Sequence, residues 1–167
     1  MEELDQFEQL NEYVHNQDWK GAEEWLQSAL ETTNDKALVL YNLGLVYKRQ
    51  DKTLDALEAF EKAGEMNPEQ APIWNEIGLI YDEAGRMSKA EVFYQKAVDA
   101  DPLLASAWNN LGVMSFVKGD FAQAQERFIR ASDLDPESEN AWINLADTCK
   151  ELGDIDCEMR ARSHLTN

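Results

Sequence analysis

The stretch WNEIGLIYDEAG at residues 74–85 decides the fold, because it returns twice with a spacing of 34 residues. Residues 108–119 read WNNLGVMSFVKG, and residues 142–153 read WINLADTCKELG. The tryptophans therefore fall at positions 74, 108 and 142, and a glycine follows each of them at 85, 119 and 153. A fixed period between about 20 and 50 residues indicates stacked supersecondary units, each burying its apolar face against the next.

Each 34-residue unit is predicted to form two amphipathic helices joined by a short turn. In the second unit, Leu43 and Tyr47 lie on one helical face, and Phe60 and Ala63 lie on another after a break at residues 50–52. Pro68 ends the second helix, because proline lacks a backbone N–H and disfavours helix in the residue before it. We therefore expect one array over residues 1–167, with repeats at about 3–36, 37–70, 71–104, 105–138 and 139–167, the first and last being degenerate.

Two sets of glycines recur with the period, and turns and packing explain them. Gly85 and Gly119 suit the left-handed cap that ends a helix. The earlier glycine of each unit lets the two helices of a pair approach closely. We expect it to face a small residue of the second helix, pairing Gly44 with Ala56, Gly78 with Ala90, and Gly112 with Ala124.

The formal net charge of −18 over 167 residues narrows the classes of partner. It disfavours nucleic acid and anionic lipid, because each phosphate would meet repulsion instead of releasing counterions. Residues 3–36 hold nine acids against two bases, a net charge of −7, which would steer a basic ligand or is simply a solvated outer face. No run approaches the roughly 18 apolar residues of a membrane span, and the acidic N-terminus lacks the features of a signal peptide.

Cys149 and Cys157 are the two cysteines of the chain. They lie eight residues apart, on what the pattern predicts to be two different helices of the last repeat. Cys149 occupies a core position, so we interpret it as a small buried hydrophobic residue. Two cysteines do not make a disulfide framework, and the spacings of zinc sites are absent. This favours a reducing compartment and a cytoplasmic protein, the alternative being export with a leader removed.

The repeated pattern resembles the tetratricopeptide repeat. It combines W-x2-[LI]-G-x2-Y with an Ala twelve residues after the Gly, an aromatic residue four later, an Ala three later and a Pro five later. Units two to four match nearly every place, whereas Glu158 and Arg162 replace the small and the aromatic residue of the fifth unit. That stretch is either a degenerate final helix that caps the array or a truncated one. The resemblance implies an all-α, right-handed solenoid of about five antiparallel helix pairs.

The resemblance also implies a concave groove, lined by the first helices, that binds an extended peptide or a partner helix. Carried over to the matching places of this chain, the groove residues are Asn11, Tyr41, Asn42, Leu45, Lys48, Arg49, Asn75, Leu79, Asp82, Asn109, Asn110, Val113, Phe116, Asn144 and Asp147.

A row of asparagines is the sharpest feature of this groove. Asn42, Asn110 and Asn144 occupy the sixth place of their units, and Asn75 and Asn109 the fifth. An amide side chain offers an acceptor and two N–H donors, so the row would pair with the backbone of an extended peptide. This resembles the asparagine ladders of some peptide-binding members of the family. Alternatively, asparagine at these places belongs only to the repeat pattern.

Apolar and charged side chains flank the asparagines. Leu45, Leu79, Val113 and Phe116 would form an apolar strip for side chains of the ligand, unless they contact the flanking helix of the next repeat. Lys48 and Arg49 would hold a carboxylate, whereas Asp82 and Glu83 suit a ligand bearing Lys or Arg, or form a solvated rim. A two-carboxylate clamp, as in co-chaperones that bind chaperone tails, is not expected, because Phe7, Pro72 and Glu76 stand where it requires bases.

The sequence contains no recognisable catalytic motif. His15 and His164 lie at opposite ends of the chain, and no phosphate-binding loop or nucleophilic constellation stands out. We therefore expect no enzyme activity, cofactor or metal, and a protein–protein interaction module that binds a protein or peptide, with the negative charge favouring a basic one. The alternatives are a scaffold that self-associates through its terminal repeats as a homo-oligomer, and an acidic decoy that mimics nucleic acid.

Overall fold

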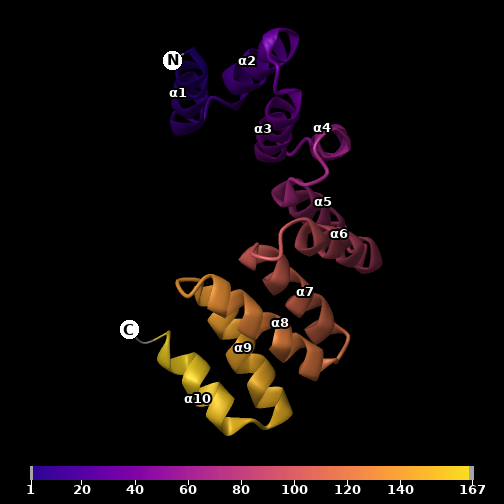
Figure 1. Cartoon of the computed structure of the whole chain (residues 1–167), viewed down its shortest axis with the longest axis vertical. Helices are drawn as coiled ribbons and strands as arrows, with labels where there is room; N and C mark the ends of the chain where they lie inside the picture. Colours follow the sequence, from indigo (N-terminus) through magenta and orange to yellow (C-terminus); the bar gives the residue numbers. More distant parts are fainter. Residues whose placement is uncertain (1, 166–167) are drawn as a thin grey trace. The chain divides into compact units, whose positions relative to one another are not determined.

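The computed structural model describes residues 2–165, with side chains from Glu8 onward, so Phe7 lies outside the described side chains. These residues form ten α-helices and no strand, and the helices follow one another as pairs (Figure 1). The all-α fold of helix pairs predicted from the 34-residue period is confirmed. The chain divides into two compact units, Met1–Glu69 and Gln70–Asn167. That all the repeats form a single array stays a prediction.

The first unit contains α1 (Glu2–His15), α2 (Trp19–Thr32), α3 (Lys36–Arg49) and α4 (Thr53–Met66). Each helix packs against the next one in the chain. Aspartates start two of them: the carboxylate of Asp18 accepts from the N–H of Gly21 at 2.9 Å, and that of Asp35 from the N–H of Leu38 at 3.0 Å. These contacts satisfy N–H groups that have no partner inside the helix. The core here is a cluster of buried side chains, including Leu10, Ala22, Leu26, Val39, Leu43 and Val46.

The second unit contains α5 (Ala71–Glu83), α6 (Met87–Ala100), α7 (Ala105–Val117), α8 (Phe121–Leu134), α9 (Glu139–Leu152) and α10 (Ile155–Ser163). The pairs α5–α6, α7–α8 and α9–α10 pack most extensively, and α6–α7 and α8–α9 join one pair to the next. Among the described residues, no helix combines the length and the apolar character that crossing a bilayer requires.

The turn within each pair uses the left-handed backbone conformation. Gly85, Gly119 and Gly153 have φ values of 70°, 79° and 71°, which confirms the caps predicted at Gly85 and Gly119. In the first unit, Gln17 and Asp51 occupy the corresponding places with φ values of 54° and 58°. The turn geometry therefore recurs every 34 residues, even where a side chain makes that conformation cost more.

The earlier glycine of each pair contacts an aromatic ring, which corrects the expectation that it faces an alanine. A Cβ atom placed on Gly112 would lie 2.5 Å from Cε1 of Phe128, and one on Gly78 would lie 2.5 Å from the ring of Tyr94. Both rings are essentially inaccessible to solvent. The pattern predicted the close approach of the two helices, but the neighbour is the aromatic residue four positions after the alanine.

The repeated tryptophan and proline are linked directly. The indole N–H of Trp108 donates to the carbonyl of Pro102 at 2.9 Å, and that of Trp142 donates to the carbonyl of Pro136 at 2.8 Å. The proline ends one helix pair and the tryptophan begins the next, six residues later. The indole therefore fixes the connection between the pairs as well as filling space.

The cysteines are paired, which corrects the interpretation of Cys149 as an unpaired buried thiol. A disulfide joins Cys149 of α9 to Cys157 of α10, with 5.8 Å between their Cα atoms. The spacing of eight residues spans the turn at Gly153, and the two helices bring the side chains together across it. The argument for a reducing compartment rested on unpaired thiols, and this pairing removes its basis.

Candidate functional site

The first helices of the second unit border a cavity of about 410 Å³. Its lining comes from α5, from α7, from the start of α9 and from the end of α8 with the turn that follows: Asn75, Glu76, Leu79, Ala105, Ser106, Asn109, Asn110, Ala131, Asp135, Ser138, Asn140 and Ala141. Four residues of the predicted groove therefore meet there, namely Asn75, Leu79, Asn109 and Asn110. The described lining contains two carboxylates, and neither lysine nor arginine.

The asparagines of the second unit bond to one another between helix pairs. The side-chain N–H of Asn110 donates to Oδ1 of Asn75 at 3.0 Å, and that of Asn144 donates to Oδ1 of Asn109 at 2.9 Å. Asn75 is buried, with 7% of its surface exposed, while the other three are partly exposed. Each amide nitrogen carries a second hydrogen that these bonds do not use. The row therefore joins neighbouring repeats, and its role toward a partner stays a prediction.

The predicted apolar strip is shared between the surface and the protein's own core. Leu79 and Val113 are partly buried against the cluster formed by α6 and α7. Phe116 is partly buried too, and its ring meets that of Phe121 edge-on at 5.2 Å. These side chains thus contact helices of their own chain and keep some exposed area, and their role toward a ligand stays a prediction.

The two acidic residues of the predicted groove in this unit have different surroundings. Asp147 is exposed and pairs with the guanidinium of Arg162 at 3.6 Å. Asp82 lies close to the hydroxyl of Tyr94, which is fully buried and makes no hydrogen bond in the described part of the chain. Burial raises the pKa of Tyr94, and the charge of Asp82 adds to that effect. Asp82 therefore acts partly on the interior of its own helix pair.

The predicted groove residues of the first unit lie on α1 and α3. Asn11 and Arg49 are exposed, whereas Leu45 and Lys48 are partly buried. The side-chain N–H of Asn42 donates to the backbone carbonyl of Leu38 in its own helix at 2.9 Å. The ring of Tyr41 lies 5.8 Å from that of Phe60. Asn42 thus bonds within its helix, unlike the asparagines of α7 and α9, which bond to the preceding pair.

Sequence reasoning missed four polar residues of the cavity. Ser106 and Asn140 occupy the second place of their units, which the family pattern assigns to the groove, so a signal existed for both. Asp135 and Ser138 come from the turn between α8 and α9, which the predicted groove places on the first helices do not include. Together they add hydroxyl, amide and carboxylate groups to the asparagine row.

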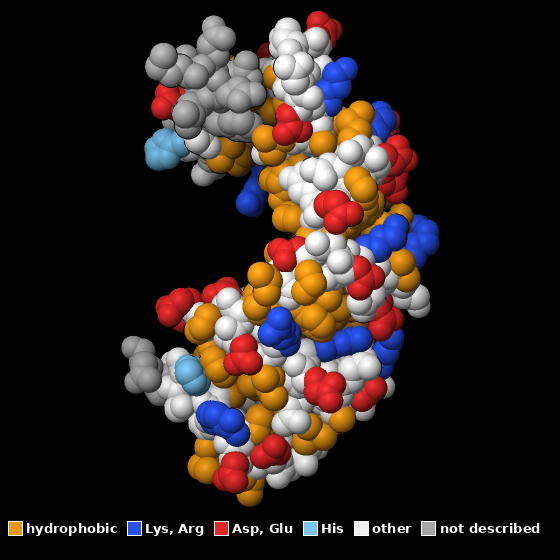
Figure 2. Space-filling model, in the orientation of Figure 1, with side chains coloured by type: hydrophobic (Ala, Val, Ile, Leu, Met, Phe, Trp, Pro, Cys, Tyr) orange, Lys and Arg blue, Asp and Glu red, His pale blue; other side chains and the backbone are white. Residues whose placement is uncertain are grey.

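Among residues 8–165, no group of three or more His, Cys, Asp or Glu side chains has a metal-binding arrangement. On the face drawn in Figure 2, acidic side chains lie dispersed among apolar and basic ones over α5–α10. What the cavity offers is hydrogen bonds from amides and hydroxyls, together with the negative charges of Glu76 and Asp135.

Comparisons with known proteins bear on this geometry. The family model described as "Tetratricopeptide repeat" matches residues 41–105 and 116–156. No curated protein sequence matches the chain. Among solved structures, the chain is similar to PilF of Pseudomonas aeruginosa, with a TM-score of 0.83 and 21% identity over 95% of this chain and 72% of that one. MamA is similar with a TM-score of 0.76 and 18% identity over 93% of this chain and 91% of that one.

A third similar structure contains a ligand. The first tetratricopeptide repeat domain of Spaghetti (RPAP3), solved bound to the HSP90 peptide SRMEEVD, has a TM-score of 0.66 and 22% identity over 72% of this chain and 96% of that one. At such identities these likenesses concern the fold.

Proposed function

The chain belongs to the tetratricopeptide repeat family, and from this premise we propose that it is a non-catalytic interaction module that binds an extended peptide at the cavity of α5, α7 and α9. The observation that carries the proposal is the polar lining of that cavity, which combines four asparagines with two serines. Such groups can pair with the N–H and C=O groups of a peptide backbone regardless of its side chains. The peptide-bound structure of a similar fold supports the same mode.

We infer further that the ligand carries Lys or Arg at this place. Glu76 and Asp135 bring negative charge to a cavity whose described lining has no basic side chain. The protein as a whole has a net charge of −18, which would attract a basic segment and repel an acidic one. An acidic tail like SRMEEVD is therefore a poor candidate for this cavity.

The test uses an array of random 12-residue peptides, followed by fluorescence anisotropy on the tightest binder. Ser106→Lys places a long cationic side chain at the mouth of the cavity, on an exposed position of α7. We expect it to weaken binding by at least about tenfold, because it fills the cavity and repels a basic ligand. Ala122→Lys, on an exposed position of α8, adds the same charge away from the cavity and is the control.

Two results would contradict the proposal. One is equal affinity of the wild-type protein and Ser106→Lys; the other is equal weakening by both lysine variants. Ser106 is a better position than Asn110 or Asn144 for this purpose. Those asparagines bond to Asn75 and Asn109, so replacing them by alanine would also alter the contact between repeats.

Self-association through the terminal repeat is a second candidate, and one observation favours it. The last helix pair exposes Leu152, Ile155 and Met159 by 42%, 68% and 60% of their surfaces. Such side chains would be covered if a second copy packed there. Sedimentation velocity at increasing concentration tests this: a dimer that Met159→Glu abolishes supports it, and a monomer throughout the micromolar range excludes it.

A further inference from the structure

Few buried side chains attach the last helix, α10, to the rest of the protein. It spans nine residues, Ile155–Ser163, of which Cys157 and Ala161 are buried. The opposite side presents Ile155 and Met159 to solvent. A helix of this length is not stable by itself in water, so its conformation depends on the contacts that attach it to α8 and α9.

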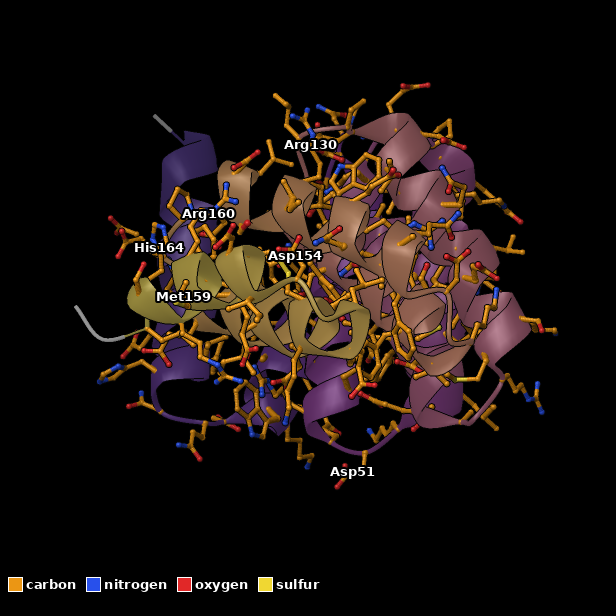
Figure 3. The ribbon with its side chains drawn as sticks, turned by 90° about the horizontal axis from the view of Figure 1, so that it is seen from below. Asp51, Arg130, Asp154, Met159, Arg160 and His164 are labelled. Carbon is orange, nitrogen blue, oxygen red and sulfur yellow. A yellow bond between two sulfur atoms is a disulfide. The ribbon has the colours of Figure 1, made fainter. Side chains whose placement is uncertain are left out.

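The noncovalent contacts of α10 and His164 with α9 include an exposed ion pair and a stack on the buried ring of Trp142. The ion pair between Arg162 and Asp147 is 3.6 Å long, and both side chains are at least half exposed, so solvent screens it strongly. The ring of His164, just beyond α10, stacks on that of Trp142 with 3.8 Å between centroids. Figure 3 looks onto this helix, with Met159, Arg160 and His164 labelled. The disulfide between Cys149 and Cys157 is the covalent attachment.

A cavity gives access to the disulfide. It measures about 300 Å³, lies between α8, α9 and α10, and has Cys157 in its lining together with Trp142, Asp154 and Arg160. The amide nitrogen of Gln125 on α8 lies 3.4 Å from the sulfur of Cys149 and 3.4 Å from that of Cys157. A small thiol can therefore approach Cys157 from the cavity. The side-chain N–H of Gln125 lies beside the sulfur of Cys149, which would be the leaving group.

From this geometry we propose that the disulfide is a reversible redox switch that controls the docking of α10. A thiolate of a dithiol reductant attacks the sulfur of Cys157, and the bond to Cys149 breaks. Cys149 leaves as a thiolate beside the N–H of Gln125 and takes up a proton. The second thiol of the reductant then closes to a cyclic disulfide and releases Cys157 as a thiol. Two electrons and two protons pass from the reductant to the protein.

Reduction has a local consequence. Without the disulfide, α10 is held by the burial of Cys157 and Ala161 and by an exposed ion pair, and the end of the chain by the packing of Leu165 and the stack of His164 on Trp142. These contacts are few, so we expect the reduced α10 to be undocked most of the time. The cavity then loses the wall formed by Asp154, Cys157, Arg160 and Ala161. The α5–α6 pair keeps its own core cluster, which includes none of these residues, whereas Ala124 and Phe128 of α8 share a cluster with Cys157 and Ala161.

Hydrogen exchange of the full chain tests the switch, with and without dithiothreitol. We expect the amides of residues 155–163 to exchange at least about tenfold faster after reduction, while those of residues 71–100 change by less than about twofold. Thiol titration in parallel should count no reactive thiol in the air-oxidised protein and two in the reduced protein. The Cys157→Ser variant should show fast exchange in α10 with or without reductant.

Three results would overturn the proposal. Equal protection of α10 in the two states would mean that packing alone holds the helix. Two reactive thiols in the air-oxidised protein would mean that the bond does not persist. Faster exchange throughout residues 71–165 on reduction would mean that the disulfide stabilises the whole unit and does not act locally.

Discussion

The two helices of a pair are held together by different contacts in α7–α8 and in α9–α10. In α7–α8, the ring of Phe128 lies on Gly112, and the hydroxyl of Ser115 donates to Oε1 of Gln123 at 3.0 Å across the turn. In α9–α10, the places of Ser115 and Gln123 are taken by Cys149 and Cys157, which form the disulfide. The α5–α6 pair has a third version, with the ammonium of Lys89 5.0 Å from the centre of the Tyr81 ring.

The difference teaches what the aromatic residue does in a regular repeat. Buried residues of α8 include Ala124 and Phe128, whereas those of α10 are Cys157 and Ala161. Allowing for the 34-residue period, the buried positions of α10 lie one residue earlier than Ala124 and Phe128 of α8. Glu158 and Arg162 occupy the places of Ala124 and Phe128; Glu158 is partly exposed and Arg162 is exposed. In this pair, which lacks the ring, a covalent bond joins the two helices.

Removing the ring of Phe128 should lower the stability of the protein more than any other change considered. Phe128→Ala deletes a fully buried side chain that contacts Gly112, and we expect the free energy of unfolding to fall by about 3–5 kcal/mol. Urea denaturation followed by circular dichroism measures the change. A loss below about 1 kcal/mol would mean that α7–α8 does not depend on its ring and would remove the contrast with α9–α10.

Adding a methyl group at Gly112, beneath the ring of Phe128, should lower the stability by a smaller amount. Gly112→Ala places a Cβ atom 2.5 Å from Phe128, and we expect a loss of about 1–3 kcal/mol because the buried ring must shift. In α9 the corresponding place already holds Ala146, which is fully buried. Denaturation of both Gly112→Ala and Ala146→Gly sharpens the comparison. Stabilisation by Gly112→Ala, as helix propensity alone would give, would contradict the ring-on-glycine contact.

The α5–α6 pair adds a test that depends on pH, because its ring belongs to Tyr94. Burial raises the pKa of Tyr94 above its usual value of 10.0, so the folded state retains the proton more firmly than the unfolded state. The resulting stability is present below pH 10 and is lost as the pH rises above it. We expect Tyr94→Phe to retain stability between about pH 10 and 11, where the wild-type protein loses it. Parallel loss of stability by the two proteins would exclude this origin.

Removing the side chain that replaces the ring in α10 should have the smallest effect. Arg162 is half exposed, and its contacts with Asp147 and Glu158 are surface ion pairs. We expect Arg162→Ala to lower the free energy of unfolding by less than about 1 kcal/mol. Denaturation at low and high salt measures it. A loss comparable with that of Phe128→Ala would show that Arg162 performs the packing role of the ring.

Much of the fold was predictable because the 34-residue period determines where the helix pairs and their turns recur. The step from Trp74 to Trp108 to Trp142 indicated stacked helix pairs, and Gly85 and Gly119 marked turns that have the expected left-handed conformation. The departure at Glu158 and Arg162 correctly singled out the last helix as atypical, although the burial of Cys157 and Ala161 in their stead was not foreseen. A period reports which places recur, and so it says little about a place where the pattern ends.

The site was less predictable, because pairing between repeats is a three-dimensional property. The asparagines were recognised, but their bonds join residues 35 apart, from Asn75 to Asn110 and from Asn109 to Asn144. Neither the spacing nor the composition distinguishes an amide that faces a ligand from one that faces its neighbour. The disulfide was missed for a similar reason, since eight residues across a turn match no familiar cysteine motif.

The hydrogen bonds from Trp108 to Pro102 and from Trp142 to Pro136 fix the length of the segments that connect one helix pair to the next. An extra residue inside either one would pull donor and acceptor apart, so insertions there should misalign everything that follows. The tips at Gly119 and Gly153 have open space where a side chain would stand, and their lengthening disturbs no such measure. An engineer who wishes to graft a loop onto this protein should therefore cut at the glycine tips and leave the spans between proline and tryptophan intact.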